Sequence, residues 1–448
     1  MSRIDLAERV HNHNYKIDPI VRSLLDTDFY KLLMAHTIRT QSKGVDVCFV
    51  VKNRTKSVRL ADTIDEAELR AQLDHVRTLR FTRSELIWLQ GNTFYGQTGI
   101  FPADTIEALR NLVLPPYVLE RDATGEYVLS FEGDHFEVTL WEIYALAILN
   151  ELRSRSAMRG MSRYELRVLY ANATSKIVGD LKALRAAGVP RIAEFGTRRR
   201  HGFLWQEFVI EAMREELGDA FLGTSNAYHS YLQDLAAIGT NAHELPMVKA
   251  ALAEIREGTD EAIADAQFGV LRDWQSTYKG HLLVALADTF GTTQFLERAK
   301  TAFPDIAGWR GFREDSKDPF VGGEEKIAFW KSLGVDPRER LQLFSDGLDV
   351  PSMIALHQAF GGRIMDGYGW GTNATNNFRG CDPRGGNAID PISIVCKVAW
   401  VRDRATGRTA SAVKLSDNYT KATGAPETVA RYRAVFGNAG MANIPTEV

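Results

Sequence analysis

Three consecutive arginines, Arg198 to Arg200, follow a short apolar run in the segment RIAEFGTRRRHG, residues 191–202. A guanidinium group presents five donors in a planar fork that matches the oxygens of a carboxylate or a phosphate. Exposed charge runs usually mix both signs on a helix, so this cluster favours anion binding. The alternative is a structural ion-pair cluster or an interface, where arginines are also common.

A second segment suited to anions is DGYGWGTN, residues 366–373. Gly367, Gly369 and Gly371 lack side chains where backbone N–H groups would approach a phosphate, and Thr372 could cap a following helix. FSDGLD, residues 344–349, offers a similar turn one expected strand earlier. Phosphate sites of α/β barrels often use two such loops, although a tight turn without a ligand has the same composition.

Carboxylates follow two other apolar runs. In FREDSKDP, residues 312–319, Arg313 and Asp315 share one face of an extended chain. Asp288 holds a comparable position in VALADTF, residues 284–290. The two carboxylates could bind ribose hydroxyls or a metal–phosphate complex, whereas Arg313 and Asp315 could also merely pair with each other.

One histidine lies among these loops, His243 in GTNAHELP. No HExxH follows, so His243-Glu244 is not a zinc motif, and most histidines are structural or simply exposed. Beside phosphate-binding loops, a histidine can also be a nucleophile that accepts a phosphoryl group.

The elements that must position these residues are short apolar runs that close on polar loops. We expect seven strands, within residues 191–200, 220–226, 236–244, 282–292, 309–316, 341–347 and 363–373. Parallel strands that alternate with helices form an open sheet or a barrel, and both bind ligands at the carboxyl ends of the strands. Nearly every run has a polar end, which favours a barrel, possibly irregular in shape.

The rest of the chain predicts a second unit. Residues 1–150 mix helices and strands, with strands expected in 46–55 and in two runs within 126–143 that meet at Gly133-Asp134. The apolar run 140–149 predicts a buried helix, and 162–188 a long one that ends near Gly188. Residues 390–448 predict two strands around Gly407, contain no reactive cluster, and are expected to join the first domain. The predicted barrel domain is 151–389.

The composition excludes several classes of protein. The 448 residues have a formal net charge of −3, which argues against nucleic-acid and membrane-surface binding. The three cysteines have no CxxC spacing, which argues against a disulfide framework or a zinc site. The charged segment 1–18 has no apolar core, as a signal peptide would, and no run is long enough to span a bilayer. A cytoplasmic protein is expected.

Together these segments resemble the nicotinate phosphoribosyltransferase family, with nine motifs in the family's order. They are LLDTDFYKLLMAH, EFGTRRRHG, FLGTSN, GTNAHE, LADTFGT, GFREDSKDP, LFSDGLD, GYGWGTN and AVKLSD. The resemblance implies an α/β fold: the irregular α/β barrel of type II phosphoribosyltransferases beside an α+β N-terminal domain. It implies that nicotinate and phosphoribosyl pyrophosphate give nicotinate mononucleotide and pyrophosphate, coupled to ATP hydrolysis. Magnesium would accompany the phosphates, and a homodimer is possible.

The same resemblance implies roles for individual residues. His243 would be phosphorylated by ATP, Phe195 would stack on the pyridine ring, and Tyr30 would reach that ring, in many relatives from a neighbouring subunit. Arg198 and Arg313 would lie near the carboxylate and the phosphates. The ribosyl group would be held by Asp288 and Asp315, and the 5′-phosphate by Ser345, Gly369 and Thr372. Ser225 would suit a carboxylate substrate, because relatives that use nicotinamide have an acid there. The family's S-G-D reads Ser316-Lys317-Asp318 here.

Other readings stay open at this point. A sister enzyme could use nicotinamide or quinolinate, but Ser225 argues against the first and the His243 segment against the second. A phosphate-binding barrel isomerase or aldolase would need a base or a Schiff-base lysine at a strand end, and no good candidate is present. An inactive homologue or a regulator of the NAD pathway would not need Arg313, Asp315 and His243.

Overall fold

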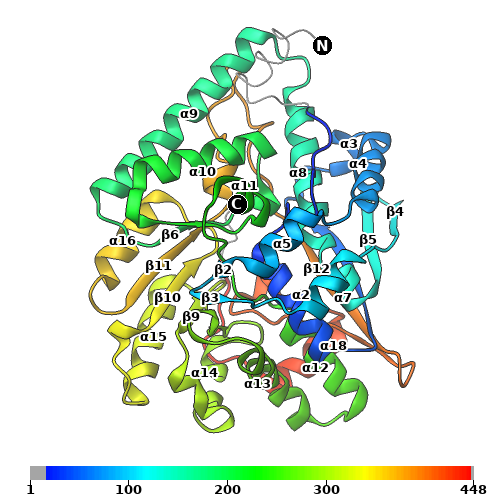
Figure 1. The fold of residues 1–448 in the computed structure, drawn as a ribbon, viewed down its shortest axis with the longest axis vertical. Coiled ribbons are helices and arrows are strands. Elements are labelled where there is room, and N and C mark those ends of the chain that lie inside the picture. Colours follow the sequence, from blue (N-terminus) through cyan, green and yellow to red (C-terminus); the bar gives the residue numbers. More distant parts are fainter. Residues whose placement is uncertain (1–16, 445–448) are drawn as a thin grey trace.

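The computed structural model describes residues 17–444, and its larger sheet has six parallel strands in the order β7-β6-β11-β10-β9-β8 (Figure 1). The strands are β6 (Ile192–Glu194), β7 (Phe221–Thr224), β8 (Val284–Leu286), β9 (Gly311–Glu314), β10 (Leu341–Ser345) and β11 (Met365–Trp370). Helices connect them, as parallel strands require. These helices are α10 (Phe203–Leu217), α11 (Ala227–Gln233), α12 (Glu244–Arg256), α13 (Asp260–Thr277), α14 (Thr292–Ala302), α15 (Pro319–Ser332) and α16 (Val350–Phe360).

Six of the seven expected barrel strands are present, and the seventh, at 236–244, is wrong. This segment forms a single bridge, Thr224 to Ala237, and then passes beside β8, where the Asn241 side chain donates to the Val284 carbonyl at 3.2 Å. It therefore spans the two edges of the sheet, β7 and β8, without a regular ladder. The expected irregular α/β barrel is confirmed, and this segment forms its irregular seam.

The smaller sheet has five antiparallel strands in the order β13-β12-β1-β5-β4. They are β1 (Val45–Asn53), β4 (Tyr117–Arg121), β5 (Tyr127–Asp134), β12 (Ile394–Asp403) and β13 (Thr409–Ser411). Of the two strands from the end of the chain, β12 pairs with β1 along its whole length, from Val45–Asp403 to Asn53–Ile394, and β13 pairs with the other edge of β12. In Figure 1 the orange β12 accordingly lies among the blue and cyan elements. The domain boundaries at 150 and 389 stay predictions.

Helices cover this sheet and join it to the barrel. They are α2 (Phe29–Gln41), α3 (Leu60–Thr63), α4 (Glu66–Thr78), α5 (Arg83–Gly91), α6 (Ala103–Arg110), α7 (His135–Val138), α8 (Trp141–Met158) and α9 (Arg163–Ala186). A two-stranded ribbon is formed by β2 (Thr93–Phe94) and β3 (Gln97–Thr98), and the last helices are α17 (Thr372–Thr375) and α18 (Pro426–Phe436). The predicted long helix is confirmed as α9, with Ser162 and Glu165 forming a capping box at its start.

The second strand expected within 126–143 is wrong, because the chain turns into α7 at His135 and then into α8. Asp134 caps α7 by accepting from the Phe136 N–H at 3.0 Å. Nearly every side chain of α8 is buried, including the charged Glu142, Glu151 and Arg155, so the helix has no apolar stripe with a helical period. A run of this kind cannot be assigned to helix or strand by periodicity alone.

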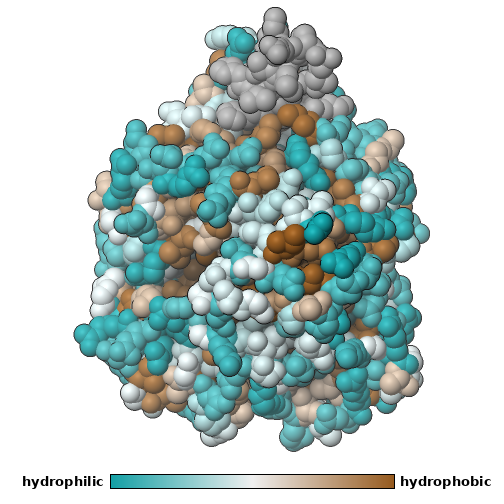
Figure 2. Space-filling view, viewed as in Figure 1, coloured by the Kyte–Doolittle hydropathy of each residue, from teal (hydrophilic) through white to brown (hydrophobic). Residues whose placement is uncertain are grey.

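One face of the molecule is mostly hydrophilic. Figure 2 shows a largely hydrophilic face on which hydrophobic side chains form small, separate groups. None of the helices described between residues 17 and 444 combines the length and the hydropathy of a membrane span. The three cysteines are buried and unpaired. Most of the segment 1–18, judged above for a signal peptide, lies outside the described residues.

Candidate active site

A polar cavity opens at the carboxyl ends of the barrel strands, against β12. Eight of the candidate residues line it, namely Phe195, Arg198, His243, Arg313, Asp315, Ser345, Gly369 and Thr372. A second, more apolar pocket shares Phe195, Arg198 and Arg313 with it and adds Tyr30 and Ser225. Asp288 lies behind the wall, with its Oδ1 3.7 Å from His243 Nε2. The fold thus brings together all the candidate residues.

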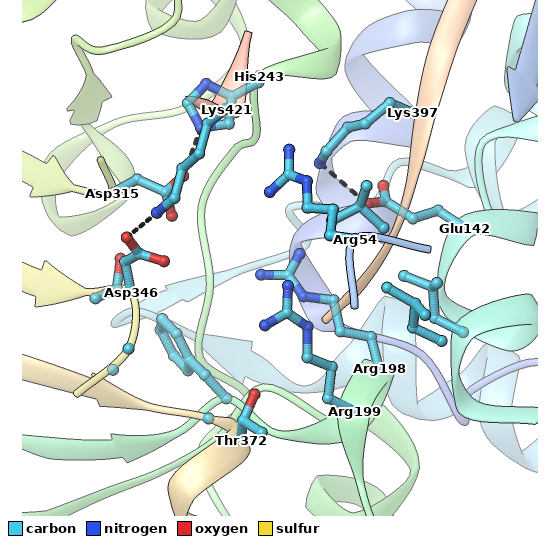
Figure 3. Close-up of a pocket in the computed structure, with 18 of the residues that line it drawn as sticks. Arg54, Glu142, Arg198, Arg199, His243, Asp315, Asp346, Thr372, Lys397 and Lys421 are labelled. Atoms are coloured by element: carbon cyan, nitrogen blue, oxygen red, sulfur yellow. Dashed lines mark hydrogen bonds and ion pairs between the residues drawn. The ribbon is translucent and has the colours of Figure 1, made fainter. Parts of the chain in front are cut away.

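One wall of the cavity is formed by Arg54, Arg198 and Arg199, which we call the arginine wall (Figure 3). Within residues 17–444, the Arg198 side chain donates only to the Tyr30 hydroxyl, 3.3 Å from its Nη1. Among residues 17–444, the guanidinium groups of Arg54 and Arg199 have no hydrogen-bonded or ionic partner. Burial and the neighbouring Arg198 lower the pKa of Arg199 to about 10. Unneutralised positive charge in a buried position is a strong attraction for an anion.

Arg200 leaves the cavity, although it follows Arg199 directly. Its guanidinium is fully buried and forms a bidentate pair with Asp26, at 2.6 and 2.8 Å. It also donates to Gln206 and to the Ile20 carbonyl. The alternative of a structural ion pair therefore holds for one arginine of the cluster. Of the three arginines, only Arg198 and Arg199 are therefore positioned to bind an anion in the cavity.

The opposite wall holds His243, whose ring is bonded on both sides. Nδ1 lies 2.9 Å from Thr289 Oγ1, while Nε2 lies 2.9 Å from Asp315 Oδ2 and 2.8 Å from Lys414 Nζ. Burial, and then the charge of Lys414, lower the pKa of His243 to about 4. The imidazole is therefore neutral near pH 7, as a nucleophile must be. Lys414 can only donate and the ionised Asp315 can only accept, so the Lys414 contact requires the tautomer with its proton on Nδ1, whereas the Asp315 contact requires the proton on Nε2. The first tautomer is the one that leaves Nε2 free to act as a nucleophile.

The carboxylates near His243 also hold the lysine. Lys414 Nζ lies 3.3 Å from Asp315 Oδ2 and 3.4 Å from Asp288 Oδ2. Burial opposes the ionised form of Asp315, but Lys414 and His243 outweigh it and hold the pKa of Asp315 well below its usual range. His243, Asp288 and Asp315 could together offer a metal three ligand atoms within 4.8 Å of one another. The ammonium group already occupies that space, so these residues do not fit a directly bound ion unless Lys414 moves.

Two turns form the floor of the cavity, as expected for a phosphate site. Ser345 to Leu348 and Gly369 to Asn373 line it side by side, because β10 and β11 are paired in parallel. A Cβ atom at Gly369 would lie 2.4 Å from the Phe195 ring, so glycine is required for that ring to lie over the strand. Asp346 lines the same floor with a φ of 91°, a strained value for a residue other than glycine.

Several lining residues were not anticipated from the sequence. Lys397, Lys414 and Lys421 come from the C-terminal segment, which was wrongly expected to contain no reactive cluster. Lys421 pairs with Asp346, and Lys397 lies 3.4 Å from Glu142 (Figure 3). Altogether seven lysines and arginines face three carboxylates around the cavity. This excess of positive charge suits a ligand with several phosphate charges.

Two positions have a different environment from the one expected. Ser225 donates to Asp28 at 2.7 Å, so the N-cap residue of α2 supplies the acid that is missing at position 225 itself. Burial raises the pKa of Asp28, which favours its neutral form beside a carboxylate ligand. Lys317, which replaces a family glycine, pairs with Glu325 at 2.5 Å and with Thr293 at 2.9 Å. It does not line the cavity.

Comparison with known proteins agrees with this geometry. The model of the nicotinate phosphoribosyltransferase (NAPRTase) family matches residues 191–440, and that of the NAPRTase N-terminal domain matches residues 25–150. The chain belongs to the nicotinate phosphoribosyltransferase family. Its activity is the transfer of a phosphoribosyl group from phosphoribosyl pyrophosphate to nicotinate, a step of NAD biosynthesis.

Solved structures of this family superpose over almost the whole chain. A nicotinate phosphoribosyltransferase from Porphyromonas gingivalis is 26% identical, with a TM-score of 0.79 over 93% of this chain and 100% of its own. The nicotinate phosphoribosyltransferase from Vibrio cholerae is 28% identical, with a TM-score of 0.78 over 94% of this chain and 95% of its own. A putative nicotinate phosphoribosyltransferase from Saccharomyces cerevisiae is 26% identical, with a TM-score of 0.78 over 94% of this chain and 100% of its own.

Proposed function

We propose that this nicotinate phosphoribosyltransferase couples synthesis to ATP through phosphorylation of His243. The observation that carries the proposal is the buried, neutral imidazole that faces a strongly cationic cavity across from the arginine wall. The γ-phosphoryl group of ATP would move to Nε2: the N–P bond forms, the P–O bond to ADP breaks, and the ring proton stays on Nδ1 against Thr289. Water would later attack the phosphorus, release phosphate and restore the histidine.

The residues around the cavity suggest how the main substrates lie. We assign the 5′-phosphate to the turns at Ser345, Gly369 and Thr372, where backbone N–H groups and cations meet. The unpaired Arg54 and Arg199 would bind the diphosphate. Magnesium carried by that diphosphate would neutralise charge on the leaving group, since the carboxylates near His243 already hold Lys414.

Nicotinate would occupy the junction of the two pockets, with its ring on Phe195 and near Tyr30, and its carboxylate against Arg198. The pyridine nitrogen attacks ribosyl C1′ as the C1′–O bond to diphosphate breaks, and the positive charge that develops on the sugar is stabilised by Asp288 and Asp315. The nitrogen is unprotonated near pH 7, so no general base is needed. Tyr30 reaches this pocket from the same chain.

The test is mononucleotide formation from nicotinate and phosphoribosyl pyrophosphate with and without ATP, in the wild type and in His243→Ala. We expect ATP to stimulate the wild type, and the variant to keep a slow ATP-independent synthesis that ATP no longer stimulates. Nicotinamide, assayed in parallel as the control substrate, should give no product. Equal stimulation of the variant by ATP would remove His243 from this role.

The ionisation of His243 can be measured directly. Since burial and Lys414 lower its pKa, the neutral ring should persist well below the ordinary histidine value of about 6.5. An NMR titration with labelled histidine, assigned by comparison with His243→Ala, should give a midpoint near 4. Lys414→Met removes the nearby positive charge and should raise the midpoint toward 6.5. A wild-type midpoint near 6.5 would contradict the electrostatics described above.

A further inference from the structure

A buried ionic network surrounds Glu244, the residue after His243. Glu244 accepts from three side chains: Lys31 Nζ at 2.5 Å, His135 Nε2 at 2.8 Å and Thr139 Oγ1 at 2.7 Å. The side chains of Lys31, His135 and Glu244 are at most 4% exposed. Burial alone would raise the pKa of Glu244, but Lys31 and the bond from His135 lower it, so the carboxylate is ionised. We call these residues the Glu244 network.

All three donors to Glu244 lie outside the barrel domain. Lys31 is on α2, His135 begins α7, and Thr139 precedes α8. Glu244 is the first residue of α12, and His243 is its N-cap, whose carbonyl accepts from the Met247 N–H at 3.0 Å. The network therefore fixes the backbone of His243 to the N-terminal helices. The imidazole itself is held from the other side, by Thr289 and Asp315 of the barrel.

The network continues to the cavity wall. Lys31 Nζ also lies 2.7 Å from Glu142 Oε2, and Glu142 lines the cavity beside Lys397. One buried ammonium group thus connects the helix that carries His243 to the wall next to Arg198. Neither Lys31 nor Glu244 lines the cavity, so neither can touch a substrate there.

We propose that the Lys31–Glu244 pair is a positioning device that sets the place of His243 relative to the arginine wall. Before phosphoribosyl pyrophosphate binds, a triphosphate held by Arg54 and Arg199 of that wall presents its terminal phosphorus to the imidazole. The inference rests on the proposed phosphorylation of His243. A buried ion pair contributes little net stability over apolar residues of the same volume, so a role in fixing geometry gives a reason for it. An error of about 1 Å in a reacting group can lower a rate about 100-fold.

The test compares two rates in one preparation of the full-length enzyme: synthesis with ATP and synthesis without it. Glu244→Gln keeps the shape of the side chain but removes its charge. We expect the ratio of the two rates to fall about tenfold or more, with less phosphohistidine formed from labelled ATP. The ATP-independent rate should stay within about twofold of the wild type. Loss of folded protein would lower both rates equally and leave the ratio unchanged.

A matched control is available in Glu151→Gln. Glu151 pairs with Arg155 at 2.8 Å, and their side chains are 8% and 5% exposed, but neither lines the cavity. Glu151→Gln should be less stable than the wild type, but its ratio of ATP-dependent to ATP-independent synthesis should be unchanged. Thr139→Val removes one donor to Glu244 without changing any charge, and should lower the ratio about threefold if Glu244→Gln does not fold.

The outcomes separate the two proposals. An unchanged ratio in folded Glu244→Gln and Thr139→Val, with phosphohistidine at the wild-type level, overturns the positioning role alone. An equal fall of the ratio in Glu151→Gln also overturns it, because any buried ion pair would then suffice. A wild type that forms no phosphohistidine overturns the proposed coupling and this inference with it.

Discussion

Replacing Arg198 with alanine is expected to lower kcat/KM for nicotinate about 100-fold or more. Arg198 is half-buried at the junction of the two pockets, and desolvation there would by itself lower its pKa. Tyr30, Asp28 and Glu142 outweigh burial and keep the guanidinium charged. Truncating one partner of a buried, hydrogen-bonded charge pair costs about 2–5 kcal/mol, and every 1.36 kcal/mol is a factor of ten in rate.

Steady-state kinetics with each substrate varied in turn would locate the effect. The loss should appear mainly in the KM for nicotinate, while the KM for phosphoribosyl pyrophosphate changes less than about threefold. Arg199→Ala is the matched comparison, because the Arg199 guanidinium is assigned to the diphosphate. That variant should raise the KM for phosphoribosyl pyrophosphate and change the KM for nicotinate less. If both variants lose affinity for both substrates equally, the assignment of Arg198 to the carboxylate is wrong.

Arg200→Ala should instead destabilise the fold, by about 3–5 kcal/mol, because it leaves the Asp26 carboxylate buried and uncompensated. Both partners are fully buried, and Arg200, with Asn226, holds the pKa of Asp26 below its usual range against the effect of burial. Calorimetry should show a clearly lower melting temperature than that of the wild type. The KM for nicotinate of the remaining folded enzyme should be unchanged.

The double variant Arg200→Met with Asp26→Leu provides the control for this prediction. It removes both charges and leaves apolar side chains of similar reach, so no unpaired charge is left buried. Its melting temperature should recover most of the loss seen in Arg200→Ala. A melting temperature as low as that of the single variant would show that the Gln206 and Ile20 contacts matter more than the ion pair.

The residues at strand ends were the part of the site that the sequence could predict. His243, Arg313, Asp315 and Ser345 each follow an apolar run, and parallel strands bring such positions to one edge. Arg54, Glu142 and Lys397 could not be found this way. They come from the other domain, have no local signature, and reach the cavity only because β12 and α8 pack against the barrel mouth.

The errors in the predicted fold have physical reasons. Residues 135–143 alternate like a strand, but from Val138 on every residue is buried in the folded protein, so the apolar pattern contained no helical period. The segment 236–244 was predicted as a strand because a short apolar run there closes on polar residues. It instead spans the gap between β7 and β8, where no neighbouring ladder with a regular register is available. In both segments the packing against the rest of the protein, and not the local sequence pattern, determined the secondary structure.

The pairing of β1 with β12 also affects the order in which the chain can fold during synthesis. Asp46 of β1 meets Arg404, just beyond β12, across 358 residues of sequence. At about 5–20 residues per second, a ribosome would need roughly 20–70 s to supply this partner. For that time one edge of β1 has no strand to pair with, and such edges invite pairing with other chains. Nascent chains therefore need protection at β1 longer than at any barrel strand, whose neighbours are made sooner.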